Sequence, residues 1–365
     1  MTCDRSVFTR WCLPMVGLVA VALSPPSLRG STLATDSEPP PVCWVLLYTG
    51  GSIGRSFPPK DIVDLFATVD TSDQATGWLC EGTIVLDLQA TSGRYYYPWP
   101  DKPLAKGQDW NAYLDSLFAP HGRLQSLDSA VAMIAARAGP ARGGFRVALM
   151  IPYSRPGADT VWVGRTSFVL VDPDGRRRAV EAYIDDVARR FAAARFQRLS
   201  FVGYYWLNEE IRTGDSVLVK QIADAVHSRR FKFLWIPYYT APGASRWRTF
   251  GFDYAWLQPN YFFHPEVPLV RLDTAVSRAR AWNLGIELEF NPKMFDQWQF
   301  ADRLEPYLTV LEDAPDLRAK SVAIYEGVGA LIRLARSHDA WHRALYERLV
   351  AVLRHSGTGA SPPSR

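Results

Sequence analysis

Short hydrophobic runs alternate with amphipathic helical segments along most of the chain, and this alternation predicts the fold. Eight runs rich in β-branched and aromatic residues indicate buried strands, at residues 44–49, 83–89, 145–153, 201–210, 231–239, 254–260, 284–290 and 321–326. Helical segments are predicted at residues 58–69, 110–118, 127–138, 179–196, 215–229, 244–250, 272–282, 300–311 and 331–353. Strands that alternate with helices indicate parallel βαβ units. The pattern therefore predicts an α/β fold, a (β/α)8 TIM barrel with extended βα loops, as a single domain over residues 42–355.

An open, doubly wound sheet is the alternative architecture for this pattern, and it would place a glycine-rich phosphate turn after the first strand. Gly50-Gly51-Ser52-Ile53-Gly54 follows that strand. This turn lacks both the G-x-G-x-x-G order and the lysine of a P-loop. We therefore favour the barrel and expect no nucleotide and no other cofactor.

The N-terminal region has the anatomy of a targeting segment. Arg5 and Arg10 precede an apolar run over residues 11–23, and small residues follow at 31–34. We expect a signal peptide over residues 1–34, with an uncleaved anchor as the alternative, although the run is short for a membrane span. Residues 35–41 form a Pro-rich linker, and residues 356–365 are expected to be a disordered tail. The mature protein is then secreted, periplasmic or on the cell surface, without stable membrane insertion.

The net charge of the chain adds little to these predictions. The whole chain has a net charge of +4, and residues 1–34 hold three Arg and one Asp, so the remainder has a net charge of +2. Such a weak charge gives little long-range attraction to nucleic acid. The run Arg176-Arg177-Arg178 is short and has no aromatic residues among it, so we interpret it as a solvated loop. Nucleic acid is not an expected partner.

Two cysteines remain after the predicted signal peptide. Cys43 and Cys80 each lie just before a predicted strand, and the two strands are consecutive. If these strands are parallel neighbours, both cysteines lie at the same end of the sheet, within the distance that a disulfide can bridge. Because exported proteins meet oxidising conditions, we predict a Cys43–Cys80 disulfide. The alternative is that both cysteines are buried free thiols.

The predicted strands end in carboxylates, amides and aromatic rings, with few His, Cys or Ser residues. In a barrel of this kind, the chemistry lies at the C-terminal ends of the strands. Carboxylates suit glycoside chemistry, in which one carboxyl protonates the glycosidic oxygen and another attacks the sugar or activates water. The candidate ligand contacts at these ends are Asp87, Tyr153, Tyr204, Trp206, Asn208, Tyr238, Gln258, Asn260, Tyr261, Glu287, Tyr325 and Glu326.

Glu209 and Glu289 form the best candidate pair, because they end the fourth and seventh strands on opposite sides of an eight-stranded ring. We assign Glu209 as the acid/base and Glu289 as the nucleophile of a retaining mechanism, with Asn208 on the neighbouring sugar hydroxyl. Glu287 faces the same side as Glu289, and Glu326 is the reserve nucleophile. The alternatives are a surface or helix-capping role for Glu209, and a buried ion pair for Glu287 and Glu289.

The aromatic candidates also include Tyr205, Trp235 and Tyr239, and all of them could form platforms for sugar rings. Strand alternation allows only about half of these rings to face the lumen. The Gln258-Pro259-Asn260 segment places two amides at one strand end, which favours a ligand site. His338 and His342 are four residues apart, a spacing found in zinc-binding helices. The sequence shows no third ligand for them, so we expect no metal.

Six segments resemble, in order, the family named domain of unknown function 4855; they lie at residues 109–118, 148–153, 203–211, 233–239, 257–263 and 285–290. This resemblance covers most of the chain after the linker, and the family is similar to glycoside-hydrolase barrels. The Asn208-Glu209 pair and the Glu end of the seventh strand are also similar to clan A retaining glycosidases. The carboxylates at the ends of the fourth and seventh strands, among rings and amides, lead us to predict a secreted glycoside hydrolase that cleaves an oligo- or polysaccharide. The rival hypotheses are a non-catalytic carbohydrate-binding or cell-surface barrel and a structural, partner-binding barrel.

Overall fold

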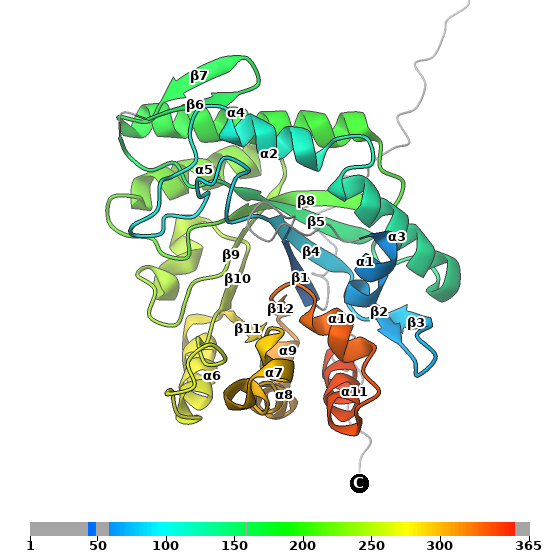
Figure 1. Cartoon of the computed structure of the whole chain (residues 1–365). Coiled ribbons are helices and arrows are strands. Elements are labelled where there is room, and N and C mark those ends of the chain that lie inside the picture. The colour runs from blue at the N-terminus through cyan, green and yellow to red at the C-terminus, as the bar shows by residue number, and fades with distance from the viewer. Residues whose placement is uncertain (1–42, 49–57, 158, 355–365) are drawn as a thin grey trace, which may run out of the picture.

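Eight parallel strands close into a barrel in the order β1-β12-β11-β10-β9-β8-β5-β4 (Figure 1), which confirms the predicted fold class. The structure, a computed structural model, describes residues 43–48, 58–157 and 159–354. The expected signal peptide (1–34), linker (35–41), glycine-rich turn (50–54) and tail (356–365) lie outside these residues. The barrel strands are β1 (Cys43–Tyr48), β4 (Gly82–Leu86), β5 (Phe145–Ile151), β8 (Leu199–Trp206), β9 (Lys232–Trp235), β10 (Tyr254–Leu257), β11 (Gly285–Glu289) and β12 (Val322–Tyr325).

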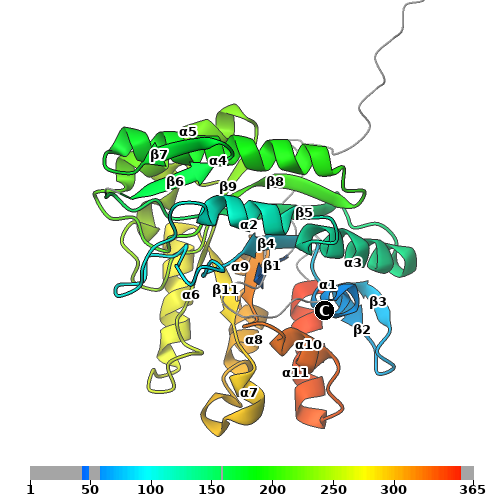
Figure 2. The ribbon, with the colours of Figure 1, turned by 45° about the horizontal axis from the view of Figure 1, so that its top comes forward.

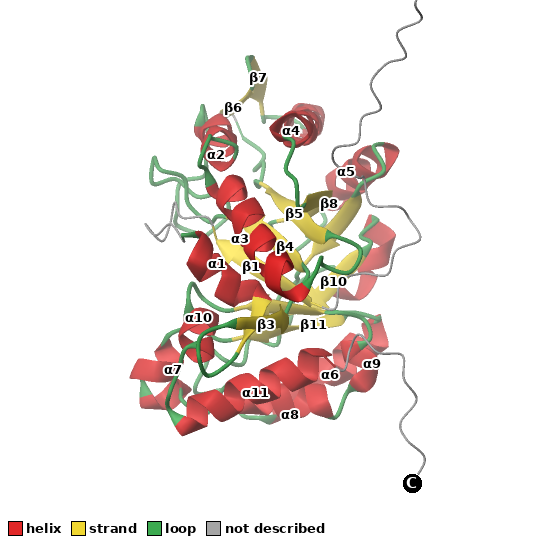
Figure 3. Cartoon of the chain, turned by 90° about the vertical axis from the view of Figure 1, so that its right-hand side faces the viewer, coloured by secondary structure: helices red, strands yellow, loops and turns green. Residues whose placement is uncertain are grey.

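Helices surround the barrel, and their apolar faces pack against its outer surface. They are α1 (Pro59–Phe66), α2 (Asp109–Leu117), α3 (Arg123–Ala138), α4 (Pro173–Ala194), α5 (Ser216–Ser228), the 3-10 helix η1 (Ala244–Phe250), α6 (Val270–Trp282), α7 (Lys293–Asp296), the 3-10 helix η2 (Trp298–Phe300), α8 (Glu305–Glu312), α9 (Pro315–Arg318), α10 (Ala330–Ala335) and α11 (Ala340–Arg354). Helices α6, α8 and α11 lie side by side on one side of the barrel (Figure 3). Among the described residues, no helix has both the length and the apolar character to span a bilayer.

Two antiparallel hairpins interrupt the βα alternation, and the hydrophobic pattern did not predict them. The first pairs β2 (Ala67–Val69) with β3 (Ala75–Trp78), so residues 67–69 are not helical as expected. Helix α1 ends at Phe66 because Ala67 is extended, and the β-branched residues that follow suit a strand. The second hairpin pairs β6 (Thr160–Val163) with β7 (Thr166–Val169), and it packs against α2 and α4 (Figure 2).

Helix α4 corrects the prediction for the arginine run. It begins at Pro173, six residues before the expected start, and Asp172 caps it by accepting a hydrogen bond of 2.7 Å from the N–H of Gly175. Arg176, Arg177 and Arg178 therefore lie in the helix and not in a solvated loop. Arg176 is buried, and its guanidinium donates to Asp215 at 2.7 Å.

The strand β8 contains a bulge that reverses which of its side chains face the lumen. Val147 of β5 pairs with Phe201, but the next residue, Ala148, pairs with Gly203, so one residue of β8 is left over. A Cβ atom on Gly203 would lie 1.9 Å from the carbonyl oxygen of Lys232, so only glycine fits there. A bulge of one residue moves every later side chain of the strand to the opposite face.

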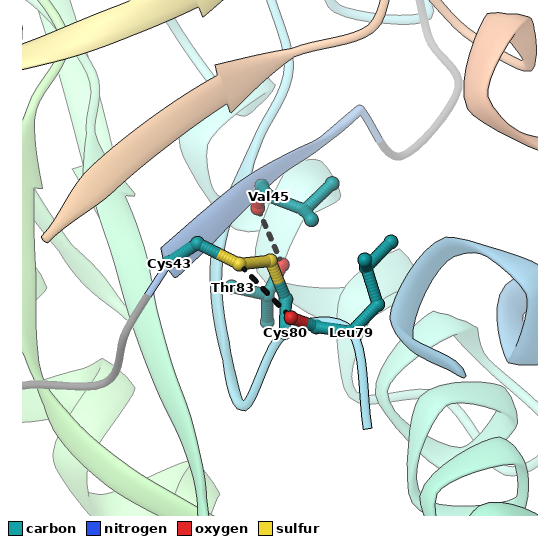
Figure 4. Close-up of a disulfide and its surroundings, with 5 residues drawn as sticks. All are labelled: Cys43, Val45, Leu79, Cys80 and Thr83. Carbon is teal, nitrogen blue, oxygen red and sulfur yellow. Dashed lines mark hydrogen bonds between the residues drawn. A yellow bond between two sulfur atoms is a disulfide. The ribbon is translucent and has the colours of Figure 1, made fainter. Parts of the chain in front are cut away.

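The predicted disulfide joins Cys43 at the start of β1 to Cys80 just before β4 (Figure 4), which confirms the pairing. The two Cα atoms lie 5.2 Å apart. β1 and β4 are neighbours in the barrel although the β2–β3 hairpin separates them in the sequence. The hydroxyl of Thr83 donates to the carbonyl oxygen of Val45 at 2.9 Å, which adds a side-chain contact between the same two strands.

Candidate active site

Glu209 follows β8 at the C-terminal end of the barrel, and hydrogen bonds hold both of its carboxylate oxygens. Gln258 donates its amide to Oε1 at 3.0 Å, and Tyr97 donates its hydroxyl to Oε2 at 3.4 Å. Burial raises the pKa of Glu209 to about 7, although these two hydrogen bonds lower it. A carboxyl group with such a pKa can give up and take back a proton near neutral pH.

Glu289 is the last residue of β11, and its carboxylate is buried. Its Oε2 accepts a hydrogen bond of 2.6 Å from the hydroxyl of Tyr307 and one of 2.8 Å from the N–H of Asn260. Burial is the largest influence on Glu289 and raises its pKa to about 7, while the hydrogen bonds from Tyr307, Asn260 and Tyr261 oppose this. The charge of Glu209 raises the pKa further, so the two carboxylates act on each other.

Two amides after β10 connect the candidate carboxylates. Gln258 donates to Glu209, Asn260 donates its side-chain amide to Oε1 of Gln258 at 3.2 Å, and the N–H of Asn260 donates to Glu289. The backbone of Asn260 has a φ of 49°, a left-handed conformation that Asn tolerates better than most residues. Its Oδ1 accepts the N–H of Tyr239 at 2.8 Å, which holds this conformation in place. The 258–260 segment thus positions both acids.

A third carboxyl, that of Glu287, lies deeper on the same strand as Glu289. It is almost completely buried, and its Oε1 has no hydrogen-bond partner among the described residues. Burial raises its pKa well above the usual range, and the charges of Glu289 and Glu209 add to that shift. Neither Glu287 nor Glu289 forms an ion pair within the part of the chain that the structure describes. The expected alternative of buried ion pairs with arginine is therefore wrong for these two residues.

Asn208 precedes Glu209 and presents an unsatisfied acceptor. Its side chain is buried, and no described residue donates to its Oδ1. Its carbonyl oxygen accepts the indole N–H of Trp235 at 2.8 Å, which fixes the backbone beside the acid. A buried acceptor without a donor is costly, and a ligand hydroxyl would satisfy it.

The bulge in β8 makes the prediction for Tyr204 and Trp206 wrong. Both side chains are buried, and the hydroxyl of Tyr204 donates at 2.6 Å to the carbonyl oxygen of Ile184 in α4, outside the barrel. Trp206 is two residues after Tyr204 and therefore points to the same face of β8, where it packs edge-on against Tyr153 and Phe233. The intervening Tyr205 points to the opposite face of the strand; burial raises its pKa, and the charges of Glu209 and Glu287 raise it further.

Three other predicted contacts use their side chains within the protein. Asp87 is buried beside Arg123 of α3, with 3.8 Å between Oδ2 and Nη1. Tyr153 donates its hydroxyl to Asp215 at 2.8 Å. The ring of Tyr261 lies 3.6 Å from the guanidinium carbon of Arg303. Their positions therefore favour a supporting role around the site.

Glu326, the reserve nucleophile, caps a helix. Its Oε2 accepts the N–H groups of Gly329 at 2.7 Å and of Leu331 at 3.0 Å, at the start of α10. Tyr325 remains beside the acids, since Glu326, Glu287, Glu289 and Glu209 all raise its pKa after burial does. Tyr238 lies at the rim and donates to Glu210 at 2.9 Å. Glu287, the other alternative nucleophile, keeps a buried carboxylate oxygen without a partner among the described residues.

Three tyrosines of the site were not predicted: Tyr48, Tyr97 and Tyr307. Tyr48 ends β1, and its ring packs edge-on against that of Tyr325 at 5.6 Å. The run YYYPWP at residues 95–100 was a signal for Tyr97, because it puts a cluster of rings into a βα loop. Nothing in the sequence indicated Tyr307, which reaches Glu289 from α8.

No group of three or more His, Cys, Asp or Glu residues could hold a metal ion within residues 43–48, 58–157 and 159–354. His342 lies in α11, where its ring packs edge-on against Phe295 with centroids 4.8 Å apart. The site is therefore built from carboxyl groups, amides and phenols.

Comparisons with known proteins place the chain in a family. The model of the family described as Domain of unknown function (DUF4855) matches residues 44–351, which confirms the expected family. No curated protein matches the sequence. Similar solved structures include a GH5 xyloglucanase from Bacteroides ovatus, in complex with a XXXG heptasaccharide (11% identity, TM-score 0.42, 83% of this chain and 70% of that one). A second is the GH18 chitinase ChiB of Flavobacterium johnsoniae (10% identity, TM-score 0.43, 85% and 93%). At these identities and TM-scores, the likeness says nothing about function.

Proposed function

The chain belongs to the DUF4855 family, and we propose that it is a secreted glycoside hydrolase that cleaves an oligo- or polysaccharide by a retaining, two-carboxylate mechanism. The observation that supports this most is the pair Glu209 and Glu289. Glu209 follows β8 and Glu289 ends β11 at the C-terminal end of the barrel, the pKa of each is raised to about 7, and the Gln258–Asn260 amides connect them. The Cys43–Cys80 disulfide suits an oxidising compartment.

In the proposed first step, a Glu289 oxygen attacks the anomeric carbon while the bond from that carbon to the glycosidic oxygen breaks. The carboxyl of Glu209 gives its proton to the departing oxygen, so that the leaving sugar departs as a neutral alcohol. In the second step, Glu209 takes a proton from water, and the water oxygen displaces Glu289 from the anomeric carbon. Both residues then have their starting protonation states.

The hydrogen bonds of the site fit these roles. Tyr307 and the N–H of Asn260 donate to Glu289, which stabilises its ionised form against the cost of burial. Glu209 receives only two neutral donors, and no cation pairs with it in the described part of the chain, so it can hold its proton near neutral pH. Oδ1 of Asn208 would accept a hydrogen bond from the sugar hydroxyl beside the reacting carbon.

The experiment is a screen of oligo- and polysaccharides for new reducing ends, with the wild type, Glu209→Gln, Glu289→Gln and the control Glu312→Gln. Glu312 is an exposed carboxylate on α8 that pairs with Arg348. We expect hydrolysis of at least one glycan by the wild type and the control, and a loss of about 10²–10⁴-fold or more in the two site variants. Hydrolysis that survives both site changes would show that other residues do the chemistry. Glycan binding without hydrolysis by any variant would favour the carbohydrate-binding rival.

A further inference from the structure

We infer that Tyr97 and Trp99, on the loop between β4 and α2, form the subsite for the sugar that leaves in the first step. This inference rests on the proposed function, because the leaving side of the site is defined by the proton donor. It adds a binding role for two residues of the YYYPWP run, neither of which is among the predicted ligand contacts. The ligand class is a pyranose or furanose ring of an oligosaccharide, bound through stacking and one hydroxyl contact.

Tyr97 links this loop to the acid. Its hydroxyl donates to Oε2 of Glu209 at 3.4 Å, although the loop starts two strands away in the barrel order. Burial raises the pKa of Tyr97, and Glu209, Glu210 and Tyr238 raise it further, so Tyr97 stays a neutral hydrogen-bond donor. The tyrosine therefore lies directly beside the carboxyl group that would protonate the glycosidic oxygen.

Trp99 extends the aromatic surface from the acid to the solvent. Its ring centroid lies 4.7 Å from that of Tyr97, with an angle of 54° between the planes. The tryptophan is 43% exposed, whereas Tyr97 is partly buried. A large ring left accessible next to a buried polar site is suited to an apolar sugar face, because stacking removes apolar surface from water.

Backbone hydrogen bonds hold the loop in one conformation before any ligand arrives. Tyr95 donates its N–H to Pro103 at 2.8 Å, and Ala105 donates its N–H back to Tyr95 at 2.8 Å. Tyr153, after β5, donates its N–H to the carbonyl oxygen of Tyr96 at 3.0 Å, and this ties the loop to the barrel. A platform that is ordered in advance loses little entropy when it binds.

The proposed mechanism determines which sugar would bind to Tyr97 and Trp99. The proton of Glu209 goes to the glycosidic oxygen, which stays with the leaving sugar. The leaving sugar must therefore lie next to Glu209, and the sugar that becomes attached to Glu289 lies on the other side of the reacting carbon. Because Tyr97 touches Glu209 and Trp99 touches Tyr97, the pair is on the leaving side.

The test compares Trp99→Ala with Trp341→Ala. Trp341 is a matched control, because it is 42% exposed but lies on the outer helix α11. Binding of an oligosaccharide is measured by calorimetry in a Glu289→Gln background, so that no hydrolysis occurs. We expect Trp99→Ala to weaken binding about tenfold or more and Trp341→Ala to have no effect. Equal affinity in the two variants would overturn the inference.

Kinetic measurements test whether Trp99 lies on the leaving-sugar side of the site. In the otherwise wild-type protein, Trp99→Ala should lower kcat/KM for an oligosaccharide at least tenfold more than for the corresponding glycosyl fluoride, whose one-atom leaving group cannot reach the platform. Equal losses on both substrates would overturn the assignment to the leaving side. A wild type that binds glycans but hydrolyses none would instead reject the proposed function, and the calorimetric comparison would still decide whether Trp99 binds sugar.

Discussion

Tyr307 donates its hydroxyl to Oε2 of Glu289 at 2.6 Å, so a side chain from α8 controls the state of a carboxylate at the end of β11. Both groups are buried, and the hydrogen bond favours the ionised form of Glu289, which the proposed nucleophile needs. Tyr307 itself is held neutral, because burial and the charge of Glu289 both raise its pKa.

Replacing Tyr307 with Phe should therefore raise the pKa of Glu289 and move the acid limb of the kcat/KM profile to higher pH. A hydrogen bond to a charged group contributes about 1.5–3 kcal/mol, which corresponds to a shift of about one pH unit or more. Tyr346→Phe is the control, because Tyr346 is a buried tyrosine that bonds to the backbone of Val69 on the outer side of the barrel. An acid limb that moves equally in both variants, or in neither, would contradict the role of Tyr307.

The wild-type profile should be bell-shaped with an optimum near pH 7. Activity rises as Glu289 loses its proton and falls as Glu209 loses its own, and the pKa of each is raised to about 7. Because the two acids interact, the protons leave in two steps that belong to the pair. On an aryl glycoside with a good leaving group, Glu209→Gln should remove the alkaline limb and keep the acid limb. Glu210→Gln, which changes the next residue, should keep both limbs.

Glu287 makes the stability of the fold depend on pH. Its pKa is raised in the folded state, so the folded protein keeps a proton that the unfolded chain releases above about pH 4.5. Folding stability then decreases as the pH rises through that range. Glu287→Gln keeps the shape without the titration, so its unfolding temperature relative to the wild type should be higher at pH 8 than at pH 4.5. A difference that does not change with pH would mean that Glu287 is ionised in the fold.

The barrel and the positions of the two acids could be predicted from the sequence, because both follow from local patterns. Each barrel strand is an apolar run of a few residues, and Glu209 and Glu289 come at the ends of two of these runs. Asp172 and Pro173 also held a signal for the start of α4 that the prediction overlooked, since Asp is a good cap and Pro suits the first turn.

The features that could not be predicted depend on contacts between residues that are distant in the sequence. The faces of Tyr204, Tyr205 and Trp206 depend on the bulge beside Gly203, and a bulge forms between two strands that are distant in sequence. A glycine inside a strand was the available hint, but it does not say where the extra residue falls. Likewise, Tyr307 meets Glu289 only because the fold brings α8 next to the end of β11.

The disulfide should contribute strongly to stability. Cys43 and Cys80 are 37 residues apart in sequence, and a loop of this size corresponds to about 4 kcal/mol in the chain-entropy model. Cys80→Ser should lower the free energy of unfolding by roughly that amount, and reduction of the wild type should have a similar effect. Denaturant unfolding with and without reductant measures this. Peptide masses that do not change on reduction would show that the bond is absent in the protein.

The most direct test of the account is to identify the carboxylate that the sugar becomes attached to. A 2-deoxy-2-fluoro glycoside with a good leaving group, made from the sugar that the glycan screen identifies, slows the second step and lets the glycosyl-enzyme accumulate. Mass spectrometry of the digested protein then locates the added glycosyl unit. The account predicts one glycosyl unit on a carboxylate oxygen of Glu289, the last residue of β11. A label on Glu287 or Glu326, or a wild type that hydrolyses its substrate without ever acquiring a label, would contradict it.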